Sequence, residues 1–142
     1  MITKLSTENI DEIIKIEEST FDNPWTRNQF IVSCQKFNKY LNYIYNDSTK
    51  VIGYLISEII LDEVHLYKIV VSEKKQNSKV GSKLLKFMIE ECKKLNKIRV
   101  CLEVDAQNCN AIKFYEKFGF FIVGNRNKYY GNNDAILMDF EL

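Results

Sequence analysis

Glu103 and Tyr115 carry the side chains best suited to acid–base chemistry in this sequence. Glu103 interrupts the apolar stretch 98–104, and a carboxylate placed among apolar residues can act as a general base. A tyrosine phenol, with a reference pKa of about 10, can protonate a leaving thiolate, whose thiol has a reference pKa of about 8.5. Structural roles are equally open: Glu103 at an exposed edge or paired with Arg99, and Tyr115 as a core aromatic.

A lysine-rich segment, residues 70–86, is the second chemical feature. A strand-like stretch ends, a polar loop follows and an amphipathic helix begins, so the free N–H groups and dipole of that helix favour an anion. Gly81 lets the backbone approach a ligand closely. The segment suits either a ligand with several phosphates or a solvated lysine-rich face. It matches neither the P-loop pattern nor the glycine fingerprint of dinucleotide sites, which argues against nucleoside triphosphates and dinucleotides.

The four cysteines, Cys34, Cys92, Cys101 and Cys109, form no C-x-x-C pair, and His65 is the single histidine. We therefore predict no metal site and interpret the cysteines as reduced, mostly buried thiols. Neither Cys101 nor Cys109 has a histidine near it in sequence to activate it as a nucleophile. Reduced thiols, together with an N-terminus that does not resemble a secretion signal, predict a cytoplasmic protein.

The length of 142 residues predicts one domain spanning 1–142, and 46% hydrophobic residues suffice for its core. The net charge of +1 gives no general attraction to nucleic acid or to a membrane surface. No apolar run approaches the length of a membrane span. We expect neither a nucleic-acid nor a membrane partner, and a monomer or weak dimer.

The elements that must position these residues follow from hydrophobic periodicity and turn signals. We predict strands at 2–5, 40–45, 51–60, 64–71, 98–104, 120–123 and 135–140, and helices after Thr7 and at 26–35, 80–95 and 111–118. Gly119 should cap the last helix, and 125–134 should be a polar loop. The order β-α-α-β-β-β-α-β-α-β-β predicts an α/β (mixed α+β) fold with a mixed, mostly antiparallel sheet flanked by helices.

The loop Gln76-x-x-Lys79-x-Gly81-Ser82 resembles the pyrophosphate-binding loop, Q/R-x-x-G-x-G/A, of the GNAT superfamily of N-acetyltransferases. Lys79 stands where the first glycine is usual. If this position requires a positive φ, lysine carries a strain of about 1 kcal/mol there. The lysine also adds a charge next to the expected diphosphate.

The second half of the chain resembles most closely the ribosomal-protein-alanine (RimI-type) branch of this superfamily. The matching segments are Leu102-Glu103-Val104, Asn108, Ala111-x-x-Phe114-Tyr115-x-x-x-Gly119-Phe120, Tyr129-Tyr130 and Asp134-Ala135-Ile136-Leu137-Met138, preceded by Glu18-x-x-Phe21-x-x-Pro24-Trp25-Thr26. The resemblance therefore covers nearly the whole chain. Two departures, Asp105 and Asn133, fall where basic and acidic residues, respectively, are common.

The resemblance implies acetyl-CoA as cosubstrate, no metal, and a cleft between the third and fourth strands after the N-terminal helices. The implied cosubstrate-binding residues are Ile69, Val70, Val71, Gln76, Asn77, Lys79, Val80, Gly81, Ser82 and Asn108. Glu103 would take the proton of the attacking amine, directly or through water, and Tyr115 would protonate the CoA sulfur, with no covalent enzyme intermediate. Asn108 could equally be a simple helix cap.

The implied acceptor is a protein N-terminus, in the first instance the N-terminal alanine of a small-subunit ribosomal protein. Trp25, Tyr129 and Tyr130 would bind it, although Trp25 suits the core and the tyrosine pair an ordinary hairpin just as well. Two alternatives remain: an acetyltransferase for a small amine or a lysine side chain, and a non-catalytic acyl-CoA-binding module. The lysine at position 79 keeps the second alternative open.

Overall fold

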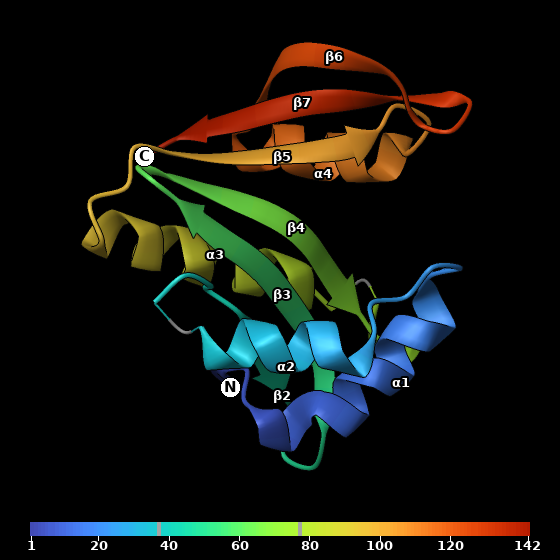
Figure 1. Ribbon diagram of the computed structural model, residues 1–142, viewed down its shortest axis with the longest axis vertical. Coiled ribbons are helices and arrows are strands. Elements are labelled where there is room, and N and C mark those ends of the chain that lie inside the picture. Colours follow the sequence, from blue (N-terminus) through green and yellow to red (C-terminus); the bar gives the residue numbers. More distant parts are fainter. Residues whose placement is uncertain (37, 77) are drawn as a thin grey trace.

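The computed structural model describes residues 1–36, 38–76 and 78–142, and of Tyr130 the backbone only. In these residues seven strands form one sheet in the order β1-β2-β3-β4-β5-β7-β6 (Figure 1). The elements are β1 (Ile2–Lys4), α1 (Ile10–Thr20), α2 (Arg27–Gln35), β2 (Tyr43–Asn46), β3 (Val51–Ile60), β4 (Glu63–Val71), α3 (Val80–Lys94), β5 (Arg99–Asp105), α4 (Cys109–Phe118), β6 (Phe121–Tyr130) and β7 (Asn133–Glu141). The predicted element order and mixed sheet are confirmed.

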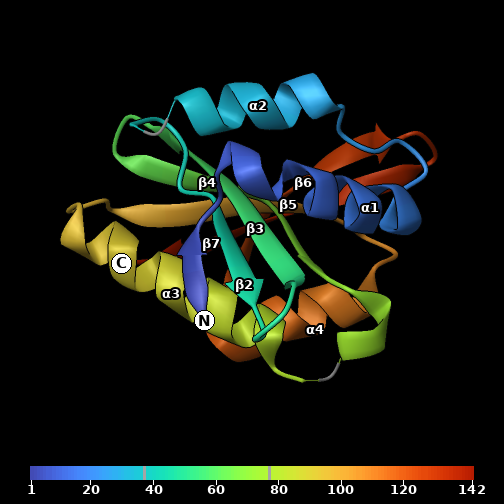
Figure 2. The same cartoon turned by 90° about the horizontal axis from the view of Figure 1, so that it is seen from below.

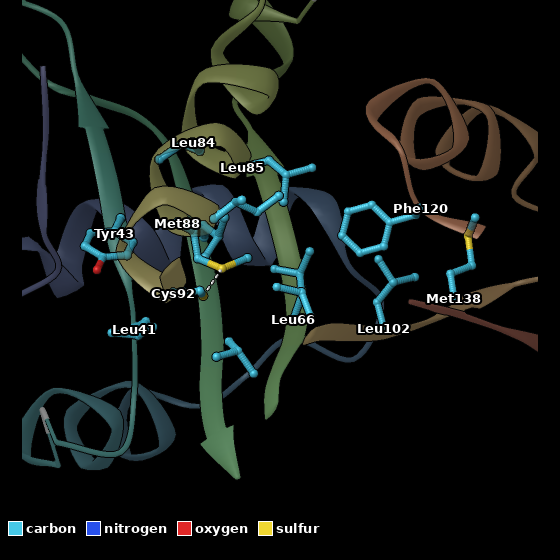
Figure 3. Close-up of a cluster of buried hydrophobic side chains, with 14 of the residues drawn as sticks. Leu41, Tyr43, Leu66, Leu84, Leu85, Met88, Cys92, Leu102, Phe120 and Met138 are labelled. Atoms are coloured by element: carbon cyan, nitrogen blue, oxygen red, sulfur yellow. Dashed lines mark hydrogen bonds between the residues drawn. The ribbon is translucent and has the colours of Figure 1, made fainter. Parts of the chain in front are cut away.

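Helices cover both faces of the sheet, α1 and α2 on one face and α3 and α4 on the other (Figure 2). The apolar stripe of α1, with Ile10, Ile13 and Ile16, is buried against β2, β3 and β4. On the other face α3 contributes Leu84, Leu85 and Met88 to a larger cluster, which continues through Leu102 to Phe120 and Met138 (Figure 3). The helical period of the sequence therefore placed these stripes correctly.

The strands β4 and β5 are the one parallel pair in the described sheet, and they pair over only half of their length. Their register runs from Glu63 opposite Arg99 to Leu66 opposite Leu102 and stops there. Tyr67 is an extra residue in β4, because Leu66 pairs with Ser57 of β3 and Lys68 with Ile56. After this bulge β4 follows β3 while β5 follows β7, so the two strands part (Figure 1).

Three local predictions differ from the structure. The expected polar loop 125–134 is mostly strand, because β6 continues to Tyr130 and β7 begins at Asn133. Gly131, with φ of +65°, lies between them. This arm is exposed to water, and its side chains are therefore mostly polar. The sequence lacks the apolar–polar alternation by which a half-buried strand is predicted. Thr7 was the expected N-cap of the first helix, but Ser6 is the N-cap, and a 3-10 turn over Thr7–Asn9 precedes α1. The strand expected from residue 40 begins at Tyr43.

Candidate active site

Glu103 lies on β5 where this strand has left β4. Residues 100, 102 and 104 are buried on the α3–α4 face, so Glu103 points to the opposite face. Its side chain is 30% exposed and forms an ion pair with Arg126 of β6, with 3.1 Å between Oε1 and Nη2. Glu103 is therefore a half-buried, ion-paired carboxylate, between the buried and the exposed-edge alternatives that the sequence left open. Arg99 is not its partner, because Arg99 pairs with Glu63 at 3.3 Å.

A cavity of about 330 Å³ opens in front of Glu103. Its lining combines polar side chains from four strands with apolar ones: His65, Leu66, Tyr67, Cys101, Leu102, Glu103, Val123, Tyr129, Leu137 and Asp139. Two carboxylates, those of Glu103 and Asp139, border this space, which suits a cationic or amine-bearing group. Burial, followed by the neighbouring carboxylates of Glu63 and Asp139, raises the pKa of the Cys101 thiol, so Cys101 is not an activated nucleophile.

Tyr115 lies on α4, which covers the other face of the sheet. Its ring is half-buried between Phe114 and Phe120, with ring centroids 5.3 and 5.5 Å away. Glu103 and Tyr115 therefore approach the sheet from opposite sides. Glu103 lines a cavity that does not include Tyr115, so a substrate that reaches both residues would have to pass between β4 and β5.

The β4 segment after the bulge, residues 67–71, pairs with β3 on one edge only. Ile69, Val70 and Val71 belong to this segment, so their backbone is placed along the opening between β4 and β5. Within the described residues, the hydrogen bond at the end of this edge runs from the side-chain amide of Gln76 to the Val71 carbonyl, at 3.5 Å. This geometry fits an extended ligand that adds its own amides to a strand edge.

A second cavity, of about 380 Å³, lies at the start of α3. Its lining residues are Val71, Lys75, Gln76, Lys79, Val80, Gly81, Ser82 and Phe114. The first backbone N–H groups of α3 have no partner within the helix, and Lys79 supplies no side-chain cap. A Cβ at Gly81 would lie 3.7–3.8 Å from Ile69, Val71 and Phe114, so glycine keeps the space between these side chains open.

Lys79 adopts the left-handed conformation, with φ of +65° and ψ of 15°, as the residue before α3. The position therefore has the backbone geometry for which glycine is the usual residue, and lysine holds it at a strain of about 1 kcal/mol. Most of the cosubstrate-binding residues inferred from sequence lie together in this region. Asn77 lies outside the described residues. Asn108 caps α4, since its side-chain oxygen accepts a hydrogen bond from the Ala111 N–H at 3.2 Å.

Of the three inferred acceptor-binding residues, Tyr129 borders the Glu103 cavity directly. It is 49% exposed, and its ring lies 4.8 Å from the Arg126 guanidinium that pairs with Glu103. Trp25 packs on Phe30 at 5.2 Å, as a core residue would, and on Tyr67 at 6.5 Å. Tyr67 lines the cavity, so Trp25 supports the wall of the cavity from behind. The side chain of Tyr130 lies outside the described part of the chain.

Glu17 is the centre of a buried polar network that the sequence pattern did not predict. Glu17 is fully buried on α1, forms an ion pair with Lys68 at 2.6 Å, and accepts hydrogen bonds from the Tyr54 hydroxyl and, at 2.7 Å, from the Trp25 N–H. Burial, and then the Glu17 carboxylate, raises the pKa of Tyr54. The Lys68 ammonium also lies over the Phe21 and Trp25 rings, at 4.6 and 4.9 Å. The one sequence signal was that Glu17 continues the apolar stripe of α1.

Comparison with known proteins agrees with this geometry. Residues 10–120 match the model of the acetyltransferase (GNAT) family. The ribosomal protein bS18-alanine N-acetyltransferase of Escherichia coli (strain K12) is 32% identical over 141 residues, covering 96% of this chain and 94% of that protein. The chain belongs to the acetyltransferase (GNAT) family, and the predicted enzyme class is confirmed.

Two solved structures show the same fold. A crystal structure of the ribosomal-protein-S18-alanine N-acetyltransferase from Escherichia coli superposes with a TM-score of 0.90 at 30% identity, over 99% of this chain and 92% of that chain. The PaiA N-acetyltransferase from Thermoplasma acidophilum, in complex with coenzyme A, superposes with a TM-score of 0.86 at 18% identity, over 100% and 98%. Among the described residues, no helix is long and apolar enough to span a membrane.

Replacing Lys79 by glycine should stabilise the protein. The Lys79→Gly change removes the left-handed strain, and we expect the free energy of unfolding to rise by about 0.5–1 kcal/mol in urea denaturation. Lys86→Gly, at an exposed position inside α3, is the matched control and should lower it by about 1 kcal/mol. A lower free energy of unfolding in Lys79→Gly would contradict the claim that the left-handed conformation strains Lys79.

Removing Lys68 should destabilise the fold strongly, because the buried Glu17 carboxylate would lose its countercharge. We expect Lys68→Met to lower the free energy of unfolding by about 3–5 kcal/mol in the same measurement. The double variant Glu17→Gln/Lys68→Met removes both charges and should recover most of this loss. If the single and double variants are equally unstable, the loss does not come from the uncompensated carboxylate.

Proposed function

We propose that this chain is an N-alpha-acetyltransferase that transfers an acetyl group from acetyl-CoA to a protein N-terminus. The alanine at the N-terminus of a small-subunit ribosomal protein is the acceptor we favour, and the 32% identical relative named for that activity supports this choice. The observation that carries the proposal is the arrangement of two cavities. One lies at the phosphate-suited start of α3 and one in front of Glu103, with the opening between β4 and β5 next to both.

Acetyl-CoA binds, in this proposal, with its pyrophosphate on the first turn of α3. The backbone N–H groups around Gly81, the nearby lysines and Gln76 receive the anion. The pantetheine arm lies along the free edge of residues 69–71 and hydrogen bonds to it like an added strand. A backbone N–H of this edge polarises the thioester carbonyl and stabilises the oxyanion as it forms. Asn108, which caps α4, is a further contact.

The acceptor amine enters from the cavity in front of Glu103. A peptide α-amine has a reference pKa of about 7.7–8.0, so part of it is neutral near pH 7. Its nitrogen attacks the thioester carbon, and Glu103 takes the proton that the nitrogen loses. The C–S bond then breaks, and Tyr115 gives its proton to the departing sulfur, so that the products are the acetylated amine and CoA. Arg126 orients the Glu103 carboxylate through their ion pair.

The side chains that line the cavity in front of Glu103 recognise the acceptor. Tyr129 provides one wall, and Trp25 supports another wall through Tyr67. We keep Tyr130 as a proposed acceptor contact on the resemblance of the Tyr129-Tyr130 pair alone. We further propose that residues 1–142 act as one domain, because all described strands belong to one sheet.

The free state of Cys34, Cys92, Cys101 and Cys109 supports a cytoplasmic location.

Glu103→Gln and Tyr115→Phe should each lower turnover by about 100-fold or more, because each removes one proton transfer. The measurement is CoA release from acetyl-CoA with a short alanine-initiated peptide, and an Nα-blocked copy of that peptide serves as the substrate control. Glu116→Gln, at an exposed position beside Tyr115, is the matched variant and should keep wild-type activity.

Reaction of the free peptide alone would support an N-terminal acceptor. Equal reaction of a blocked peptide that contains lysine would move the acceptor to side-chain amines. Binding of acetyl-CoA without turnover on any peptide or small amine would contradict the proposal and favour a non-catalytic acyl-CoA-binding module.

A further inference from the structure

Three side chains with metal-ligating atoms meet on the Glu103 face of the sheet. Glu63 and His65 are two residues apart on β4 and therefore point to the same side. The parallel register places Cys101 of β5 directly opposite His65. One ligand atom from each of the three lies within 4.8 Å of the others. Donors around one tetrahedral zinc ion are separated by about 3.3–3.8 Å, so only a small closure of these side chains is needed.

The Glu63 carboxylate is already oriented for this role. Its Oε1 faces the Arg99 guanidinium at 3.3 Å, while its Oε2 lies 3.1 Å from the Cys101 sulfur and 3.6 Å from His65 Nε2. One oxygen is thus held by a neighbouring cation and the other points to the remaining two ligands, which is how an outer group orients a metal ligand. Asp139 of β7 pairs with Cys101 in the sheet register, and its carboxylate also interacts with the Cys101 thiol.

We propose that Glu63, His65 and Cys101 form a binding site for Zn²⁺ whose fourth position is left to a water molecule. A set of one nitrogen, one sulfur and carboxylate oxygens suits this borderline-soft ion, whereas Mg²⁺ and Ca²⁺ prefer oxygen alone. On binding, the thiol proton is released to solvent and the thiolate becomes the ligand. All three residues are half-buried, and His65 and Cys101 line the cavity, so the ion has a route of entry.

The site overlaps the space assigned to the acceptor. His65, Cys101 and Asp139 line the same cavity of about 330 Å³ as Glu103. A bound Zn²⁺ would place positive charge where the acceptor amine must approach. Zinc should therefore inhibit acetyl transfer by raising KM for the acceptor without raising KM for acetyl-CoA. This consequence rests on the proposed function, whereas binding of the ion does not.

Cobalt substitution tests the site without any activity assay. Titrating the reduced, purified protein with Co²⁺ should give a thiolate-to-cobalt charge-transfer band that saturates at one ion per chain and disappears on adding Zn²⁺. Cys101→Ser should abolish the band, and Cys109→Ser, which changes an exposed cysteine on α4, should keep it. His65→Asn should weaken Co²⁺ and Zn²⁺ binding by about tenfold or more. This second variant tests the site even if Cys101→Ser does not fold.

A cobalt spectrum without a thiolate band, or a band that survives Cys101→Ser, would overturn the proposal. Binding of equal strength in wild type and His65→Asn would overturn it as well. These results are distinct from a failure of the proposed function, because they are obtained without acetyl-CoA or acceptor. If Zn²⁺ inhibits acetyl transfer by the wild type but not by Cys101→Ser, the zinc site and the acceptor site overlap as proposed.

Discussion

The parting of β4 from β5 is the constraint on which the rest of the site depends. Parallel strands normally continue side by side, yet here the pairing ends at Leu66 and Leu102, where the bulge at Tyr67 turns β4 away. The separation leaves one edge of β4 without a strand partner, where a ligand can pair with it. In the proposed mechanism, Glu103 on one face and Tyr115 on the helix of the other act on one substrate through this separation.

The opening persists because each side of it is held by its own packing. On the β5 side, Leu102 and Val104 pack into the cluster formed with α3, Phe120 and Met138. On the β4 side, Lys68 joins Glu17 of α1 in a nearly dry ion pair, which also fixes the Trp25 backbone. Such a pair contributes little net stability compared with apolar packing, but it fixes one arrangement of the segment between α1 and α2. That segment supports the cavity wall through the contact of Trp25 with Tyr67.

Much of this structure could be predicted from the sequence, because hydrophobic period and loop chemistry are local signals. They predicted the order of helices and strands and the mixed sheet, whereas the left-handed conformation of Lys79 was suggested only by the resemblance, which has a glycine at this position. Glu103–Arg126, Glu17–Lys68 and the Glu63–His65–Cys101 group could not be predicted, since each joins side chains of different elements, through strand register in the first and third cases and through the packing of α1 on the sheet in the second. The β6–β7 arm was missed for a different reason: its polar residues face water on an exposed hairpin and show no apolar alternation.

Hydrogen exchange of backbone amides, measured with and without acetyl-CoA, tests the central claim most directly. If the cosubstrate occupies the opening, the amides of residues 69–71 and the first turn of α3 should become protected on binding, while amides of α2, which covers the opposite face of the sheet, should not change. Saturation with acetyl-CoA, verified by calorimetry, without protection at residues 69–71 would contradict the account.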